Sequence, residues 1–221
     1  MIKKFLKKIF YSNRCSSGKY IDYLRKKGAI IGENCVIYDP TSTLIDETSL
    51  PFIEIGDDVQ IARGGIILGH DYSYSVCSCL GKVPRKQTTT VIGNNVFIGM
   101  NAIILMGTKI GDNVIVGAGS VVSGNLDSNS VYAGNPAKKI CTLEKYCERN
   151  EERFVESARI FAEQMYKKNN KMPEISEMGL YSALFVEKNE DNIQKYFSKA
   201  KNVECIYSIK KVFDKVEDLF D

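Results

Sequence analysis

The feature that most constrains this chain is a repeat of six residues. Six consecutive hexads each begin with an aliphatic residue, and this register does not slip; they begin at Ile92, Ile98, Ile104, Ile110, Val116 and Val122. The same register occurs earlier, at Ile55, Ile61 and Ile67, with weaker echoes at Ile31 and Ile37. A period of six matches neither the helix repeat of about 3.6 nor strands joined by hairpin turns.

A hexad repeat is typical of a solenoid in which each hexad forms one short side of a triangular coil. Three hexads, about 18 residues, would complete one turn, and the aliphatic side chains would stack inside. Glycine, Asn and Asp suit the corners, because they tolerate backbone angles that other residues avoid. The corner candidates are Asn94, Asn95, Asn101, Asp112 and Asn113. We therefore predict a mainly β chain folded as a parallel β-helix.

The register also predicts an extruded loop. Ile67 and Ile104 should be stacked neighbours, yet they lie 37 positions apart, whereas one coil needs about 18. The excess of about 19 residues, approximately 73–91, is therefore expected to leave the coil. The loop would begin just after His70, which is the only histidine of the chain.

The hexads and the segment IGDNVIVGAGSVVSGNLDSNSVYAGNPAKKI, residues 110–140, resemble the hexapeptide acyltransferase family. The resemblance covers roughly residues 28–140, and its last coils are similar to those of the sugar and polysaccharide O-acetyltransferase branch. It implies a left-handed β-helix, a handedness that spacing alone does not give. It also implies direct transfer of an acetyl group from acetyl-CoA to a hydroxyl, with no covalent acyl-enzyme, in a homotrimer with active sites between subunits.

His70 is the candidate catalytic residue. Acyl transfer needs a base for the hydroxyl proton, and an imidazole can serve near neutral pH. His70 lies in the sequence ILGHDY, where the loop leaves the scaffold, and the resemblance implies that it is the general base. Its second ring nitrogen needs an acceptor, for which Asp71 is poorly placed because neighbouring strand residues point to opposite faces. We expect a backbone carbonyl or Glu54 instead.

Other residues are candidates for binding the two substrates. Backbone amides at a glycine corner can stabilise an oxyanion, small residues can border a pantetheine arm, and lysines can bind phosphates. For acetyl-CoA, the candidates at the oxyanion are Gly99 and Ala102, and those beside the pantetheine arm are Ala118 and Ser120. The candidates for the phosphates are Lys138 and Lys139. A polyhydroxylated acceptor would bind by ring stacking and hydrogen bonds. The candidates for that role are Tyr38, Asp39, Arg63, Tyr72 and Arg85.

Composition excludes several classes of protein. A single histidine excludes a site built from several imidazoles within one subunit, and the seven cysteines contain no CxxC pair, so neither a metal cofactor nor a disulfide framework is expected. No apolar run approaches the roughly 18–20 residues that cross a bilayer. No signal-peptide core is present either. These observations favour a cytoplasmic protein, and nothing indicates a nucleic-acid partner.

Both ends of the chain differ from the repeats. Residues 1–27 hold nine Lys or Arg and one Asp, and they are expected to form a helical segment. Its start, MIKKFLKKIF, would either pack on the β-helix domain, residues 28–141, or touch anionic lipid as a peripheral contact. Residues 142–171 show helical spacing. Residues 172–221 should form a small helical or α+β extension, with strands at LYSALFV and VECIYSI and helices at 191–201 and 210–220.

Two other functions remain open at this point. An amino-sugar N-acetyltransferase would use the same scaffold and the same base. A non-catalytic β-helix could instead serve as a binding or assembly module, with the C-terminal extension as its docking element. A metal-dependent hydratase on this kind of scaffold is disfavoured, because it would require three histidines and the chain has one.

Overall fold

The computed structural model describes residues 12–198, 206–207 and 209–220. The chain divides into a β-helix unit, Met1–Tyr146, and a C-terminal unit, Cys147–Asp221. The helix expected at MIKKFLKKIF lies outside the described residues. Among those described, no helix combines the length and the apolar character that a membrane span requires.

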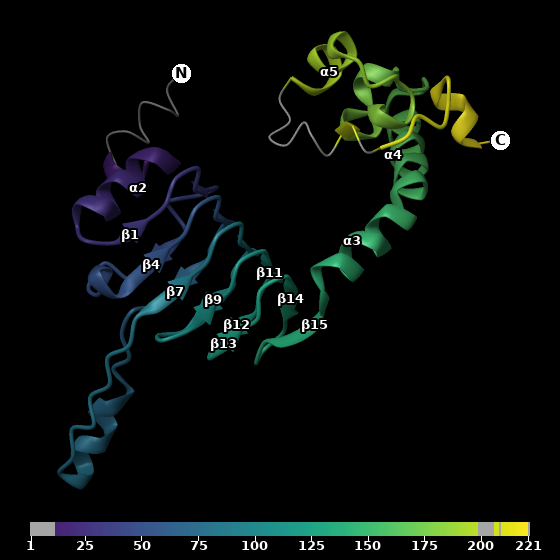
Figure 1. Ribbon diagram of the computed structural model, residues 1–221. Helices are drawn as coiled ribbons and strands as arrows, with labels where there is room; N and C mark the ends of the chain where they lie inside the picture. Colours follow the sequence, from purple (N-terminus) through teal and green to yellow (C-terminus); the bar gives the residue numbers. More distant parts are fainter. Residues whose placement is uncertain (1–11, 199–205, 208, 221) are drawn as a thin grey trace. The chain divides into compact units, whose positions relative to one another are not determined.

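Three sheets form the sides of the β-helix unit (Figure 1). We call them sheets A, B and C. Sheet A contains β1 (Ile30–Ile31), β4 (Ile53–Ile55), β7 (Thr90–Ile92), β10 (Lys109–Ile110) and β13 (Asn125–Leu126). Sheet B contains β2 (Val36–Ile37), β5 (Gln60–Ile61), β8 (Phe97–Ile98), β11 (Val114–Val116), β14 (Ser130–Ala133) and β15 (Lys138–Thr142). Sheet C contains β3 (Leu44–Ile45), β6 (Ile66–Ile67), β9 (Ile103–Ile104) and β12 (Val121–Val122).

The order of the strands confirms the predicted coil. Consecutive strands from β1 to β12 belong to sheets A, B and C in turn, and neighbours among these twelve strands are parallel, whereas β15 pairs with β14 in the antiparallel direction. Ile67 pairs with Ile104 across the predicted interruption, and both side chains are fully buried. The aliphatic residue of each hexad therefore points into the prism, where burial of apolar surface stabilises the fold.

Corner residues act in two ways. Asn95, Asn101 and Asn113 have φ of 52°, 56° and 57°, the left-handed conformation that the sequence predicted for them. Asp112 serves differently, because its Oδ1 accepts a hydrogen bond of 2.6 Å from the Asn94 amide one coil away. This bond ties two neighbouring coils together at the corner between sheets A and B.

The extruded loop is present where the register placed it. The chain leaves the coils after β6, forms a 3-10 helix, η3 (Ser73–Leu80), and returns at β7, so the loop projects from the coils (Figure 1). Gln87 Nε2 donates a 2.6 Å hydrogen bond to the Gly69 carbonyl, and Thr90 Oγ1 donates one of 2.7 Å to the Leu68 carbonyl. The two limbs of the loop are therefore joined at its base.

A short helix covers the first coil. The segment α2 (Ser17–Lys26) follows η1 (Ser12–Arg14), and the Ser16 hydroxyl accepts from the Lys19 amide at its start. Tyr20 and Leu24 on this helix are fully buried among the first inward-facing residues of the β-helix. The amphipathic face of α2 thus closes an end of the apolar core that would otherwise face water.

The described part of residues 172–221 contains short helices joined by turns and coil, with no strand. Residues 143–169 form two helices, α3 (Leu143–Glu152) and α4 (Phe154–Asn169), which are followed by η4 (Ile175–Glu177), η5 (Gly179–Leu184), α5 (Glu190–Phe197) and η6 (Val216–Phe220). The expected strand LYSALFV is wrong: it forms η5, and Ala183 to Val186 are all buried. A short apolar run fits a buried helix as well as a strand. Of VECIYSI, residues 203–209, the described residues are 206 and 207, which are helical, and 209, which lies in a bend.

Candidate active site

His70 is held at the corner between sheets C and A by a buried carboxylate. Its Nδ1 contacts Oδ2 of Asp46, and Thr48 Oγ1 lies 3.2 Å from the same nitrogen. Asp46 follows β3 in the neighbouring coil, and its side chain is only 4% exposed, whereas that of His70 is 29% exposed. The buried Asp46 therefore fixes the ring from one side. The other side of the ring is accessible, and chemistry can take place there.

Several donors keep Asp46 ionised. The Gly69 amide donates to Oδ2 at 3.0 Å, and the amide and hydroxyl of Thr48 donate to Oδ1 at 3.1 Å and 2.6 Å. Burial raises the pKa of Asp46, but the hydrogen bonds from Thr48, His70 and Gly69 outweigh it, so the pKa lies below its usual value. An ionised carboxylate only accepts, so Nδ1 of His70 carries hydrogen. In the neutral ring Nε2 is then free to take a proton.

Asp46 replaces the orienting groups expected from the sequence. Glu54 lies on β4, where it pairs with Ile30 and Val91, and it makes no described contact with His70. Asp71 accepts hydrogen bonds from the amide and hydroxyl of Ser73, at 2.8 Å and 3.0 Å, so it shapes the start of the loop, as its poor placement beside the ring predicted.

A second set of contacts supports the turn that carries Asp46. Glu47, between Asp46 and Thr48, accepts from Arg14 Nη2 at 2.6 Å and from the Tyr23 hydroxyl at 2.8 Å. Arg14 also donates to the Thr43 carbonyl at 3.1 Å. The N-terminal helices thereby anchor the turn at Glu47. The residues on either side of Glu47, Asp46 and Thr48, contact the imidazole.

A pocket opens on the exposed side of His70. The Tyr72 ring lies 4.7 Å from the imidazole, edge to face at 77°, and Tyr74 stacks on Tyr72 at 5.9 Å. Arg85 comes from the returning limb of the loop. The full lining is Thr48, Ser49, His70, Asp71, Tyr72, Tyr74, Arg85, Lys86 and Gln87. Two of the predicted acceptor residues, Tyr72 and Arg85, are thus brought to the candidate base.

The other predicted acceptor residues lie at a different corner. Tyr38 and Asp39 follow β2, and Arg63 follows β5, so all three occupy the corner between sheets B and C. Tyr38 donates to Gln60 Oε1 at 2.6 Å, and Arg63 lies 3.6 Å from Asp39. Within one chain they are not part of the His70 pocket, so the five candidates for the acceptor do not form one site there.

Three of the predicted acetyl-CoA residues use their hydrogen-bonding groups within the coils of the β-helix. The Gly99 amide donates to the Val116 carbonyl at 2.8 Å, and the Ala102 amide donates to the Gly99 carbonyl at 3.2 Å. The buried Ser120 hydroxyl donates to Gly117 and accepts from the Gly134 amide. Their hydrogen-bonding groups are therefore occupied, and Gly99 and Ala102 do not supply a free oxyanion donor, contrary to expectation.

The remaining candidates for acetyl-CoA are exposed. Ala118 lies on the corner between sheets B and C, and Lys138 begins β15. Lys139 forms an ion pair of 3.0 Å with Asp127, and the hydrogen bond from this pair raises the pKa of Lys139. Ala118 and Lys138 thus have free surface for a ligand, while Lys139 already has a partner.

Comparison with known proteins identifies the family. Residues 89–124 match the model described as bacterial transferase hexapeptide (six repeats). WbbJ of Escherichia coli strain K12, named as a lipopolysaccharide biosynthesis O-acetyl transferase, is 32% identical over 162 residues, which cover 61% of this chain and 82% of WbbJ. The chain belongs to the bacterial hexapeptide transferase family.

A further relative and a solved structure are similar to this chain. Protein CapG of Staphylococcus aureus is 41% identical over 128 residues, covering 57% of this hexapeptide transferase and 72% of CapG. The crystal structure of a maltose O-acetyltransferase from Clostridium difficile 630 is 29% identical with a TM-score of 0.38, and covers 57% of this chain and 75% of that one. The predicted acyltransferase class and left-handed β-helix are confirmed.

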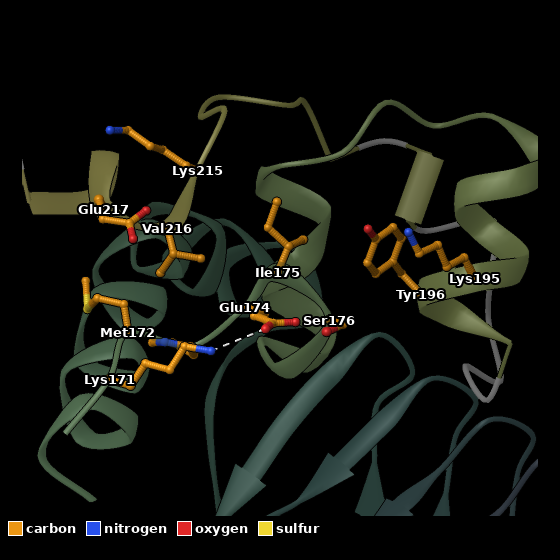
Figure 2. A pocket seen from close by; sticks show the side chains of 11 residues that line it. Lys171, Met172, Glu174, Ile175, Ser176, Lys195, Tyr196, Lys215, Val216 and Glu217 are labelled. Atoms are coloured by element: carbon orange, nitrogen blue, oxygen red, sulfur yellow. Dashed lines mark hydrogen bonds and ion pairs between the residues drawn. The ribbon is translucent and has the colours of Figure 1, made fainter. Parts of the chain in front are cut away.

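The C-terminal unit of this hexapeptide transferase has a pocket of its own. Figure 2 shows Lys171 directed toward Glu174, with which it forms an ion pair of 3.4 Å, while Tyr196 and Lys195 lie across the pocket. None of the predicted site residues lines it. Within the described residues, no group of three His, Cys, Asp or Glu side chains is placed to hold a metal ion.

Proposed function

We propose that the chain is an acetyl-CoA-dependent O-acetyltransferase that acts on a hydroxyl of a sugar or cell-surface polysaccharide. The observation that carries this proposal is His70, oriented by buried Asp46 and facing a pocket with two tyrosine rings. A base and an aromatic surface are what a sugar hydroxyl needs for activation and binding. Similarity to WbbJ, named as a lipopolysaccharide biosynthesis O-acetyl transferase, supports the same chemistry.

In this mechanism His70 acts at one nitrogen. Nε2 takes the proton of the acceptor hydroxyl while that oxygen attacks the acetyl carbonyl of acetyl-CoA. When the carbon–sulfur bond breaks, the imidazolium returns the proton to the departing sulfur, so no acyl group is attached to the protein. Asp46 stabilises the imidazolium through Nδ1 and keeps the ring in the required tautomer.

We expect mass spectrometry to separate O-transfer from N-transfer. Candidate glycans incubated with the protein and acetyl-CoA should gain the mass of an acetyl group in place of hydrogen, and mild alkali should remove it, because an ester is labile to base and an amide is not. An alkali-stable product would instead identify an amino-sugar N-acetyltransferase. No product on any glycan, together with no binding of coenzyme A by calorimetry, would favour a non-catalytic binding module.

The proposal includes a homotrimer, for which sheet C provides an observation. Its outward residues Leu44, Ile66, Ile103 and Val121 lie side by side in register and are all apolar. Leu44 is 45% exposed, and the other three are partly exposed. Such a column is suited to burial against another copy of the chain.

Sheet C also separates the two halves of the predicted site. His70 lies at its corner with sheet A, whereas Ala118 lies at its corner with sheet B. A single prism therefore cannot bring the acetyl-CoA wall to the base. In a closed ring of three, the His70 corner of one subunit would face the Ala118 corner of the next, which gives three equivalent grooves.

Complementation tests the shared groove. His70→Ala removes the base, and Ala118→Trp should block the acetyl-CoA wall while sparing the buried column. Equimolar mixing after dissociation and reassembly should restore about a quarter of wild-type activity, because about one groove in four combines two intact halves. No recovery, or a fully active monomer by light scattering, would contradict the arrangement.

A further inference from the structure

The extruded loop has an unusual charge. Residues 72–91 contain Lys82, Arg85 and Lys86 and no Asp or Glu, in a chain that has 30 basic and 27 acidic residues in total. Two of the three cations, Arg85 and Lys86, line the pocket in front of His70. A loop whose charged side chains all have the same sign, when it lines a pocket, raises the local concentration of ligands with the opposite charge.

These two cations lack carboxylate partners. Other arginines of the β-helix unit are paired: Arg14 with Glu47 at 2.6 Å, Arg25 with Glu33 at 3.1 Å, and Arg63 with Asp39 at 3.6 Å. Within the described residues, neither Arg85 nor Lys86 has an ion pair within 4.0 Å. They are therefore available to a ligand.

The acidic groups at the pocket are already occupied. Asp71 accepts two hydrogen bonds from Ser73, which are the main reason that its pKa lies below the usual value, with smaller contributions from His70 and Lys86. Asp46 lies behind the imidazole, buried and bonded to His70, Thr48 and Gly69. Neither carboxylate forms an ion pair with the loop cations.

The same pocket offers a surface for a sugar ring. Tyr72 is 63% exposed and stacks on Tyr74 with an interplanar angle of 26°. Because Tyr72 also contacts the His70 ring, a pyranose lying on it would place a hydroxyl near the base and its substituents near the loop. Tyrosine supplies such a rigid amphipathic contact at low entropic cost.

We infer that the acceptor sugar carries a negative charge, a carboxylate or a phosphate, which Arg85 and Lys86 bind while the ring lies on Tyr72. This inference rests on the proposed function and specifies its substrate class. Acetyl-CoA does not account for the two cations as well, because a pantetheine arm with two amide units separates its reacting thioester from its phosphates. With the thioester at His70, those phosphates lie beyond this pocket.

Three matched probes test the inference: methyl glucuronide, glucose 1-phosphate and neutral methyl glucoside. Each is offered to the 221-residue protein at equal concentration and low ionic strength, with and without acetyl-CoA. Binding is followed by the broadening of sugar proton signals in NMR, and transfer by the release of coenzyme A thiol. We expect about 10- to 100-fold tighter binding of an anionic probe than of the glucoside, equivalent to a charge-assisted hydrogen bond. The preference should weaken as salt is added.

Variants of the loop assign the effect. The double variant Arg85→Gln, Lys86→Gln should lose the preference, so that an anionic probe binds no more tightly than the glucoside. Lys82→Gln makes the same kind of charge change on the same loop but outside the pocket, and should keep the preference. The probe that loses more affinity in the double variant distinguishes a carboxylate from a phosphate.

The possible outcomes separate this inference from the proposed function. Transfer to the glucoside as efficient as transfer to the anionic probes would overturn the charged acceptor but keep the enzyme. Anion binding with no transfer to any probe would count against the enzyme but support the anionic ligand. A double variant whose KM rises for acetyl-CoA and not for the sugar would show that the cations serve the thioester substrate, which overturns the inference.

Discussion

His70→Ala should lower turnover by about 10²- to 10⁴-fold, the usual effect of losing a positioned general base. The loss should fall on kcat, with the KM for acetyl-CoA little changed, because the base acts in the transition state rather than in binding. Steady-state kinetics with acetyl-CoA and a glycan that the wild type acetylates would measure it. Turnover equal to that of the wild type would rule out the mechanism.

The fold of this variant should remain intact for two reasons. His70 is not part of the inward aliphatic column, which continues through Ile67 to Ile104 beside it. In addition, Asp46 would keep its three donors from Thr48 and Gly69, so no buried carboxylate is left without a partner. Circular dichroism and the thermal unfolding midpoint, compared with those of the wild type, would check this expectation.

The sequence predicted the scaffold because its period is regular where the coils are regular. From Ile92 to Val122 each inward residue occurs at a fixed spacing, so the stacking of Ile67 on Ile104 and the loop between them followed directly. His70 was recognised as the only histidine and for its position at the base of that loop. These inferences needed only the spacing of residues along the sequence.

Asp46 was missed because the first coil is irregular. Ile45 pairs with Ile67, 22 positions away, where a regular coil has about 18. The extra residues include η2 (Leu50–Phe52), and no hexad pattern revealed that Ile45 belongs to the column of Ile67. Once that pairing is known, Asp46 can be placed. It follows the strand that pairs with the strand before His70, so it lies one coil away from His70.

The separation of Tyr38 and Asp39 from His70 was open to prediction. Ile37 belongs to the column of Ile61 and Ile98, whereas His70 follows the column of Ile67 and Ile104. Assigning Tyr38 and Asp39 to the first column and His70 to the second would have placed them at different corners of the coil. In contrast, the commitment of the Gly99 amide to the Val116 carbonyl depends on backbone geometry, for which the residue types give no signal.

Asp46→Asn should lower turnover by about 10²- to 10³-fold. An asparagine whose oxygen keeps accepting from Thr48 turns its NH₂ group toward Nδ1 of His70 and requires that nitrogen to accept. The ring proton would move to Nε2, where no lone pair remains for the acceptor hydroxyl. In the Ser–His–Asp triad the same change costs about 10⁴-fold for this reason. Comparison of kcat with that of Asp71→Asn, whose carboxylate binds Ser73 and not the ring, provides the control.

The same variant should change how stability depends on pH. Because the folded-state pKa of Asp46 lies below its unfolded value, about 3.9 for a free side chain, the ionised carboxylate stabilises the fold above that pH. This contribution is lost as pH falls through the folded-state pKa. Wild type should therefore lose stability relative to Asp46→Asn as pH falls from about 5 to below about 4, so their difference in free energy of unfolding should shrink. Urea unfolding at these pH values measures that difference. A difference that did not shrink in acid would mean that the carboxylate is not held ionised beside His70, and the tautomer argument would fail with it.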